Sequence, residues 1–279
     1  MAKHSANLSL SIQGSGEPLV LLHGWGLNQA IWFPIRELLA EKFQVITVDL
    51  PGFGESAWYP GDEDFQSASS RVMAELAQSI GKPFHLAGWS LGGLFAMQMA
   101  LDYPTYIKRL TTIASSPCFM ARGNWPGIKQ ATLEAFRYQL TNDFHKTLER
   151  FLAVQALGSP AAREEIKTMR KLLNERPEPH PQALIAGLRW LAEVDLRKPL
   201  EQLTVPLLRM YGRRDSLVPI ATSDAVQSYL PSSFAGQTQD GQHALAAPPP
   251  LHFTESAHAP FFTEPERFAT ELYRWHLGQ

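Results

Sequence analysis

The amino-acid sequence predicts an α/β protein, with a mostly parallel central sheet flanked by helices and a helical cap inserted into the chain. Short apolar runs alternate with longer helical patterns before residue 118, as in parallel sheets whose strands are joined by helices. The strand pattern is absent from residues 118–193 and resumes afterwards. We therefore predict a core domain of residues 1–117 and 194–279, and a cap of residues 118–193.

The expected strands are short apolar runs closed by turn-forming residues. They are residues 19–22, 43–49, 83–87, 110–114, 205–212 and 251–254. Helical periodicity predicts core helices at residues 70–80, 94–101, 221–230 and 265–277. Proline and glycine breakers divide the cap into several helices. Residues 236–250 are polar, then rich in alanine and proline, and are expected to form a long surface excursion.

Composition excludes several function classes. The 279 residues carry a formal net charge of −2, so no general attraction to nucleic acid or anionic membrane is expected. The N-terminus lacks a secretory pattern, and no apolar run reaches the ~18 residues of a membrane span. Cys118 is the only cysteine, which rules out a disulfide within the chain and a multi-thiolate metal site. We expect a cytoplasmic monomer without metal or cofactor.

The segment Gly88-Trp89-Ser90-Leu91-Gly92 predicts a nucleophilic serine. It follows an apolar strand and precedes a helix, which is the context of the nucleophile elbow in α/β-hydrolases. Small residues on either side of Ser90 allow the sharp turn that exposes its hydroxyl. The following helix directs its positive end at the reacting oxygen. Ser90 is therefore the candidate nucleophile of a serine hydrolase with the α/β-hydrolase fold.

A serine hydroxyl needs a base, and the sequence offers nine histidines. His258 is the candidate because it lies between the last strand and the last helix, at the end of the sheet where such folds build their sites. His252 is expected within a strand, His243 in the surface excursion and His85 in the core.

The acid that orients the base should lie between the serine and the histidine in chain order. Asp215 follows the penultimate strand and is the candidate. Its carboxylate would fix the imidazole tautomer. Asp195, before that strand, and Asp224, within a helix, are the rivals.

Two backbone amides are candidates for the oxyanion hole. The N–H of Leu91 directly follows the nucleophile, and the N–H of Trp25 belongs to the loop after the first long strand. The imidazole of His23, in the same loop, is expected to tie the loop together by hydrogen bonds.

Six segments together resemble one family, the pimeloyl-[acyl-carrier protein] methyl ester carboxylesterases of bacterial biotin synthesis. They are residues 22–28, 48–54, 88–94, 114–119, 125–129 and 149–155. The resemblance covers nearly the whole chain, and the segments Ser-Ser-Pro-Cys-Phe and Trp-Pro-Gly-Ile-Lys are its most specific parts. Residues 236–250 depart from it as an insertion.

The resemblance implies hydrolysis of the methyl ester of pimeloyl-[acyl-carrier protein] to the free acid and methanol. It implies a triad of Ser90, Asp215 and His258. The substrate contacts that it implies are Trp25, Ser90, Leu91, Phe151, Leu152, Ala153, Val154, Gln155 and His258.

Basic residues at helical spacing lie in the cap, and they make acyl carrier protein a candidate partner. Lys146, Arg150, Arg163 and Lys167 are the candidate docking residues. Neighbouring glutamates dilute this charge, and a solvated helix face is the alternative interpretation.

Two other functions stay open from the sequence. One is a broad-specificity short-chain carboxylesterase or thioesterase. The other is a small-molecule receptor that has kept the fold and lost turnover, because fold alone does not fix function.

Overall fold

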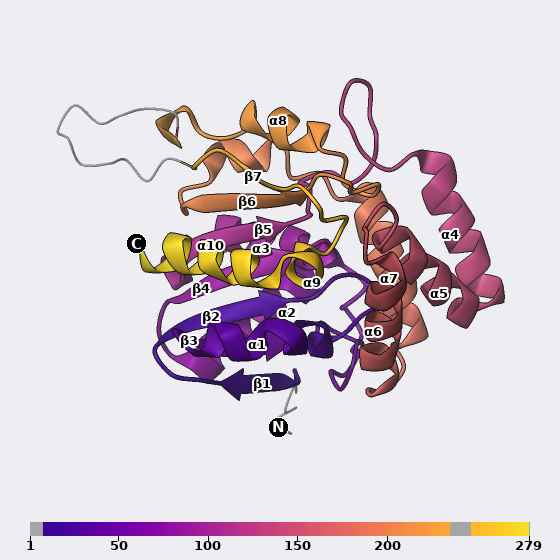
Figure 1. The fold of residues 1–279 in the computed structure, drawn as a ribbon, viewed down its shortest axis with the longest axis horizontal. Coiled ribbons are helices and arrows are strands. Elements are labelled where there is room, and N and C mark those ends of the chain that lie inside the picture. The colour runs from indigo at the N-terminus through magenta and orange to yellow at the C-terminus, as the bar shows by residue number, and fades with distance from the viewer. Residues whose placement is uncertain (1–7, 235–246, 279) are drawn as a thin grey trace.

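The structure is a computed structural model that describes residues 8–234 and 247–278. Within these ranges lies a seven-stranded sheet in the order β1-β3-β2-β4-β5-β6-β7 (Figure 1). Only β1 is antiparallel to its neighbour. The strands are β1 (Leu10–Gln13), β2 (Glu17–Leu22), β3 (Phe43–Val48), β4 (Phe84–Trp89), β5 (Ile107–Ile113), β6 (Leu207–Gly212) and β7 (Leu251–Phe253).

Helices cover both faces of the sheet because its strands are apolar on both sides. In β2, Leu19 and Leu21 join one buried cluster, and Val20 and Leu22 join the other. The first cluster includes side chains of α1 and α10, and the second includes side chains of α2 and α3. The core helices are α1 (Phe33–Ala40), α2 (Phe65–Ile80), α3 (Leu91–Asp102), α8 (Ala221–Gln227), α9 (Pro260–Thr263) and α10 (Pro265–Leu277).

The predicted fold class is confirmed, with differences at the margins. Strand β1 and helices α1 and α9 are additional elements. Helix α2 begins at Phe65, five residues before the predicted start, because the Asp64 side chain caps it by accepting from the Ser67 amide. Helix α3 begins at Leu91, three residues before the predicted start, because it follows Ser90 directly.

Four further helices lie together beside the end of the sheet (Figure 1). They are α4 (Gln130–Asn142), α5 (Phe144–Gln155), α6 (Ala162–Asn174) and α7 (Pro181–Glu193), and all come between β5 and β6. The core and cap boundaries drawn above stay a prediction.

The expected excursion before β7 lies largely outside the described residues, His243 included. Residues 247–250 form neither helix nor strand and lead into β7. Among the described residues, no helix combines the length and the apolar character that a membrane crossing requires.

Candidate active site

Ser90 occupies a strained turn between β4 and α3. Its φ is +55° and its ψ is −118°, a conformation that a residue with a side chain rarely adopts. A Cβ at Gly88 would lie 2.2 Å from the Gly92 carbonyl oxygen, and a Cβ at Gly92 would lie 2.4 Å from the Leu22 carbonyl oxygen. The two glycines of the motif are therefore required by backbone contact.

His258 and Asp215 form a buried pair. His258 Nδ1 lies 2.7 Å from Asp215 Oδ2, and the two side chains are 1% and 0% exposed. The other carboxylate oxygen, Oδ1, accepts from the backbone amides of Leu217 at 2.8 Å and Val218 at 3.0 Å. These bonds fix the carboxylate, and the carboxylate fixes the imidazole with its proton on Nδ1.

The second ring nitrogen of His258 is left as an acceptor. Nε2 is buried and has no hydrogen-bond partner within the described part of the chain. The bond from a nucleophile to its base commonly tightens only when substrate binds. Trp89, which precedes Ser90, donates to the His258 carbonyl oxygen at 2.7 Å, so the base lies at the end of β4 that carries the serine.

The rival acids and histidines have other partners. Asp195 forms an ion pair with Arg197 at 2.6 Å, and this hydrogen bond lowers the pKa of Asp195. Asp224 belongs to the first turn of α8. His252 bonds to a serine hydroxyl on α8 at 3.1 Å. His85 is buried beside another histidine, with ring centroids 4.7 Å apart. Asp215 is the acid that contacts His258.

The predicted oxyanion amides lie next to the nucleophile. Leu91 is the first residue of α3, and amides of a first helical turn have no partner within the helix. The loop that carries Trp25 approaches Ser90 closely, because a Cβ at Gly24 would lie 3.3 Å from the Ser90 Cβ. Among the described residues, neither the Leu91 nor the Trp25 amide donates to another backbone group outside the regular elements.

His23 has the structural role that the sequence predicts. Its Nδ1 lies 2.8 Å from the Gly24 carbonyl oxygen, and its Nε2 accepts from the Leu50 amide at 2.9 Å. Burial lowers the pKa of His23. A neutral imidazole thus joins the loop after β2 to the loop after β3.

Helix α5 brings two of the predicted substrate contacts to the site. The Phe151 ring packs edge-on against Trp25, with centroids 4.7 Å apart. The carbonyl oxygen of Gln155, the last residue of α5, accepts from the His258 amide at 3.2 Å. Leu152 is buried in the cluster that also contains Trp89.

The other two predicted contacts on α5 are less buried than Phe151, Leu152 and Gln155. Ala153 is exposed and Val154 is half-buried. The Val154 carbonyl oxygen accepts from the Ser216 hydroxyl at 3.4 Å, beside the candidate acid.

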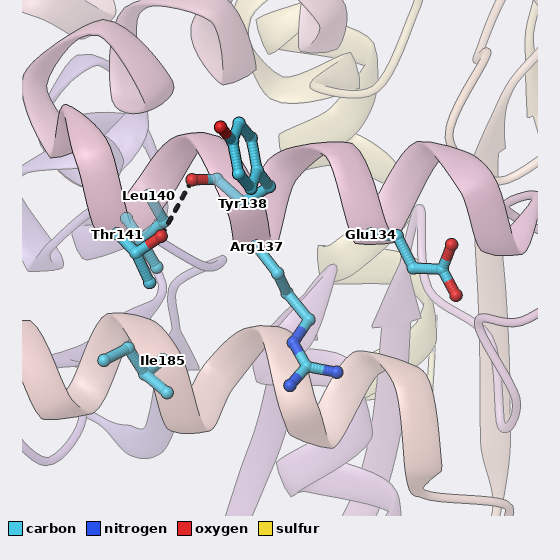
Figure 2. Close-up of a pocket in the computed structure, with 6 residues that line it drawn as sticks. All are labelled: Glu134, Arg137, Tyr138, Leu140, Thr141 and Ile185. Carbon is cyan, nitrogen blue, oxygen red and sulfur yellow. Dashed lines mark hydrogen bonds between the residues drawn. The ribbon is translucent and has the colours of Figure 1, made fainter.

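Helix α5, in the predicted cap, contacts the loops that carry Trp25 and His258. Ser90 is 3% exposed. A hollow of about 300 Å³ lies on the cap surface between α4 and α7 (Figure 2). Glu134, Arg137, Tyr138, Leu140 and Thr141 of α4 and Ile185 of α7 line it. None of the candidate catalytic residues lines this hollow.

Two contacts of the site were not anticipated from the sequence. The Ser115 hydroxyl donates to the Ser90 carbonyl oxygen at 2.7 Å, and Trp89 donates to His258 as described above. Trp89 lies in residues 88–94 and Ser115 in residues 114–119, two of the segments that carry the family resemblance. Their spacing gave no sign of these hydrogen bonds, because the partners lie 25 and 169 residues away.

Comparison with known proteins agrees with this geometry. A family model described as "alpha/beta hydrolase fold" matches residues 17–247. A solved esterase from Exiguobacterium antarcticum superposes with a TM-score of 0.81 at 24% identity, covering 96% of this chain and 94% of that one. At that identity the likeness establishes the fold.

Curated relatives are much more similar. The pimeloyl-[acyl-carrier protein] methyl ester esterase of Vibrio vulnificus (strain YJ016) is 46% identical over 269 residues, which is 96% of this chain and 97% of the relative. The protein of the same name from Aeromonas hydrophila is 45% identical, over 94% of this chain and 96% of the relative. The chain therefore belongs to the pimeloyl-[acyl-carrier protein] methyl ester esterase family, within the alpha/beta hydrolase fold.

Proposed function

We propose that this chain hydrolyses the methyl ester of a pimeloyl group carried by acyl carrier protein, releasing methanol and the free carboxylate. The observation that carries the proposal is the buried His258–Asp215 pair at 2.7 Å, beside a strained Ser90. The relatives above are named for this ester. The resemblance assigns the step to biotin synthesis.

The reaction proceeds in two steps. The Ser90 hydroxyl attacks the ester carbonyl carbon while His258 Nε2 takes its proton. The amides of Trp25 and Leu91 stabilise the negative oxygen of the tetrahedral intermediate. His258 returns the proton to the leaving methoxide, which departs as methanol. Water activated by His258 then attacks the acyl-enzyme, and the free acid leaves Ser90.

The candidate docking cations are exposed on α5 and α6. Lys146 and Arg163 have no ion-pair partner within the described ranges. Arg150 donates to the Gln139 side chain at 3.2 Å and has no ion-pair partner among the residues that the structure describes. Lys167 lies 3.8 Å from Glu164 in an exposed pair, and such pairs contribute little. These charges support docking of an acidic carrier protein.

The two alternatives are less well supported. A broad-specificity carboxylesterase or thioesterase would use the same three residues, so only substrate preference separates it from the proposal. A receptor without turnover would have no need for an imidazole whose Nδ1 contacts a fixed carboxylate and whose Nε2 has no partner among the described residues. A cytoplasmic location and a monomeric state stay predictions.

The test is a comparison of kcat/KM on three substrates. They are the pimeloyl methyl ester on acyl carrier protein, the same ester on free pantetheine, and p-nitrophenyl acetate. The proposal predicts at least a tenfold preference for the carrier-bound ester over the pantetheine ester, which is about 1.4 kcal/mol. Equal values would favour the broad-specificity esterase. No turnover of any ester would favour the receptor.

A further inference from the structure

Trp89 occupies the variable position between Gly88 and Ser90 in the nucleophile motif. Its side chain is fully buried. The indole Nε1–H donates to the His258 carbonyl oxygen at 2.7 Å. The indole and imidazole rings also pack together, with centroids 5.6 Å apart at an angle of 49°. The residue before the nucleophile therefore contacts the candidate base directly.

The same ring supports the candidate oxyanion loop. A Cβ at Gly24 would lie 3.3 Å from two carbons of the Trp89 ring. Gly24 precedes Trp25, whose amide is one of the predicted oxyanion donors. One side chain thus contacts the loop of the base and the loop of the oxyanion donor, and it is covalently adjacent to the nucleophile.

Other aromatic rings pack against the Trp89 ring. Phe261 packs edge-on against it at 5.1 Å, and Trp32 packs edge-on at 6.4 Å. The backbone amide of His258 donates to the Gln155 carbonyl oxygen at 3.2 Å. The backbone of His258 is therefore held from both directions, by the strand of the nucleophile and by the cap.

We propose that Trp89 is a positioning residue that sets the distance between His258 and Ser90 through its indole N–H. The inference rests on the proposed ester hydrolysis. Without this donor the buried His258 carbonyl is left unpaired, and an unpaired buried acceptor is costly enough to shift its loop. A displacement of about 1 Å costs on the order of 100-fold in rate for a positioned catalytic group.

The experiment compares two identical substitutions in one aromatic cluster. Trp89→Phe keeps an aromatic ring and removes the hydrogen-bond donor. Trp32→Phe is the matched control, because Trp32 is also fully buried and its Nε1 has no partner among the described residues. Both variants lose the same volume, and only one loses a hydrogen bond. The substrate is p-nitrophenyl acetate, so the result does not depend on the carrier protein.

Trp89→Phe is expected to lower kcat by about 10- to 100-fold, with KM changed less than about twofold, because binding does not use the His258 carbonyl. Trp32→Phe is expected to keep kcat within about threefold of the wild type, since it removes packing alone. Equal effects of the two substitutions on kcat, whether large or small, would overturn the inference. Absence of turnover by the wild type would instead contradict the proposed function.

A second variant covers the case in which Trp89→Phe does not fold. Incorporation of 3-benzothienylalanine at position 89 replaces the indole N–H by sulfur and keeps the shape of the ring. The same fall in kcat is expected. Wild-type kcat in this variant would show that the hydrogen bond does not position the base.

Discussion

The end of the sheet and the outer face of the cap are built on different principles. At the end of β4, Ser90, His258 and Asp215 are buried, and backbone contacts fix each of them. On the cap, Lys146 and Arg163 are exposed and carry no ion-pair partner in the described chain. The first region holds the candidate catalytic residues in a fixed geometry. The second region presents positive charge to solvent.

This difference has energetic consequences. Buried polar contacts resist change because an unpaired partner is costly. Exposed charges are screened by salt, and each contributes little on its own. Substitutions at the end of the sheet should therefore act on kcat for every ester. Substitutions of the exposed cations on the outer face of the cap should act on kcat/KM for the carrier-bound ester alone.

The largest effect is expected from Ser90→Ala. Removing the nucleophile of a serine hydrolase costs about 10⁶-fold in kcat. The loss should be the same for the carrier-bound ester and for p-nitrophenyl acetate, measured by product release at saturating substrate. A variant that kept more than a hundredth of the wild-type kcat would remove Ser90 from the mechanism.

Asp215→Asn is expected to lower kcat by about 10⁴-fold on both substrates. The amide can hold the imidazole in place, yet it favours the wrong tautomer and does not stabilise the imidazolium. The matched control is Asp224→Asn, since Asp224 lies on α8 away from His258. The control should keep wild-type kcat in the same assay. Equal losses in the two variants would exclude Asp215 as the orienting acid.

Charge reversal on the cap should have a smaller and more selective effect. Arg150→Glu combined with Arg163→Glu is expected to lower kcat/KM about tenfold for the carrier-bound ester at low salt. The effect should shrink as salt screens the charges. Lys82→Glu is the control, because Lys82 is exposed before β4, at the end of that strand opposite Ser90.

Kinetics on p-nitrophenyl acetate complete this comparison. The double variant should match the wild type on this substrate, since the site is untouched. Unchanged kcat/KM on the carrier-bound ester would mean that the carrier does not dock through this face.

The smallest effect on activity is expected from the opposite end of β4. Burial, with the nearby Lys108, lowers the pKa of His85 to about 4. Burial also lowers the pKa of His276, whose ring packs against His85. The unfolded chain therefore binds more protons than the folded chain below about pH 6.5. Stability present above that pH is lost as the pH falls toward 4.

His85→Gln removes one of these groups and should flatten the pH dependence of Tm. The wild-type Tm should fall by more than the variant Tm between pH 7 and pH 5, by roughly 5 °C. Thermal melts at the two pH values measure the difference. Parallel Tm curves would exclude His85 as a source of acid sensitivity. The kcat of the variant at pH 7 should equal that of the wild type.

Most of the sheet could be predicted from the sequence, and the candidate site residues could be proposed from it, for physical reasons. The apolar strands are continuous in sequence, so both ends of all six predicted strands lie within three residues of the observed ends. Ser90 and its glycines form a local motif because a tight turn is a local structure. Chain order and the strand preceding Asp215 were enough to prefer it over Asp195.

Other features depend on contacts that no local pattern contains. Strand β1 is short, and Ile12 in it is 56% exposed, so it lacks the buried pattern of the other strands. The bond from Trp89 to His258 joins residues 169 positions apart. The outward orientation of Ala153 depends on how α5 packs on the core. Long-range packing determines each of these.

The most direct test of Ser90 as the nucleophile is to map the reactive serine. The wild-type protein is treated with a serine-directed fluorophosphonate, digested and analysed by peptide mass spectrometry. We expect one adduct, on Ser90, and its loss in Ser90→Ala. An adduct on another residue, or undiminished labelling of Ser90→Ala, would contradict the assignment of Ser90 as the nucleophile.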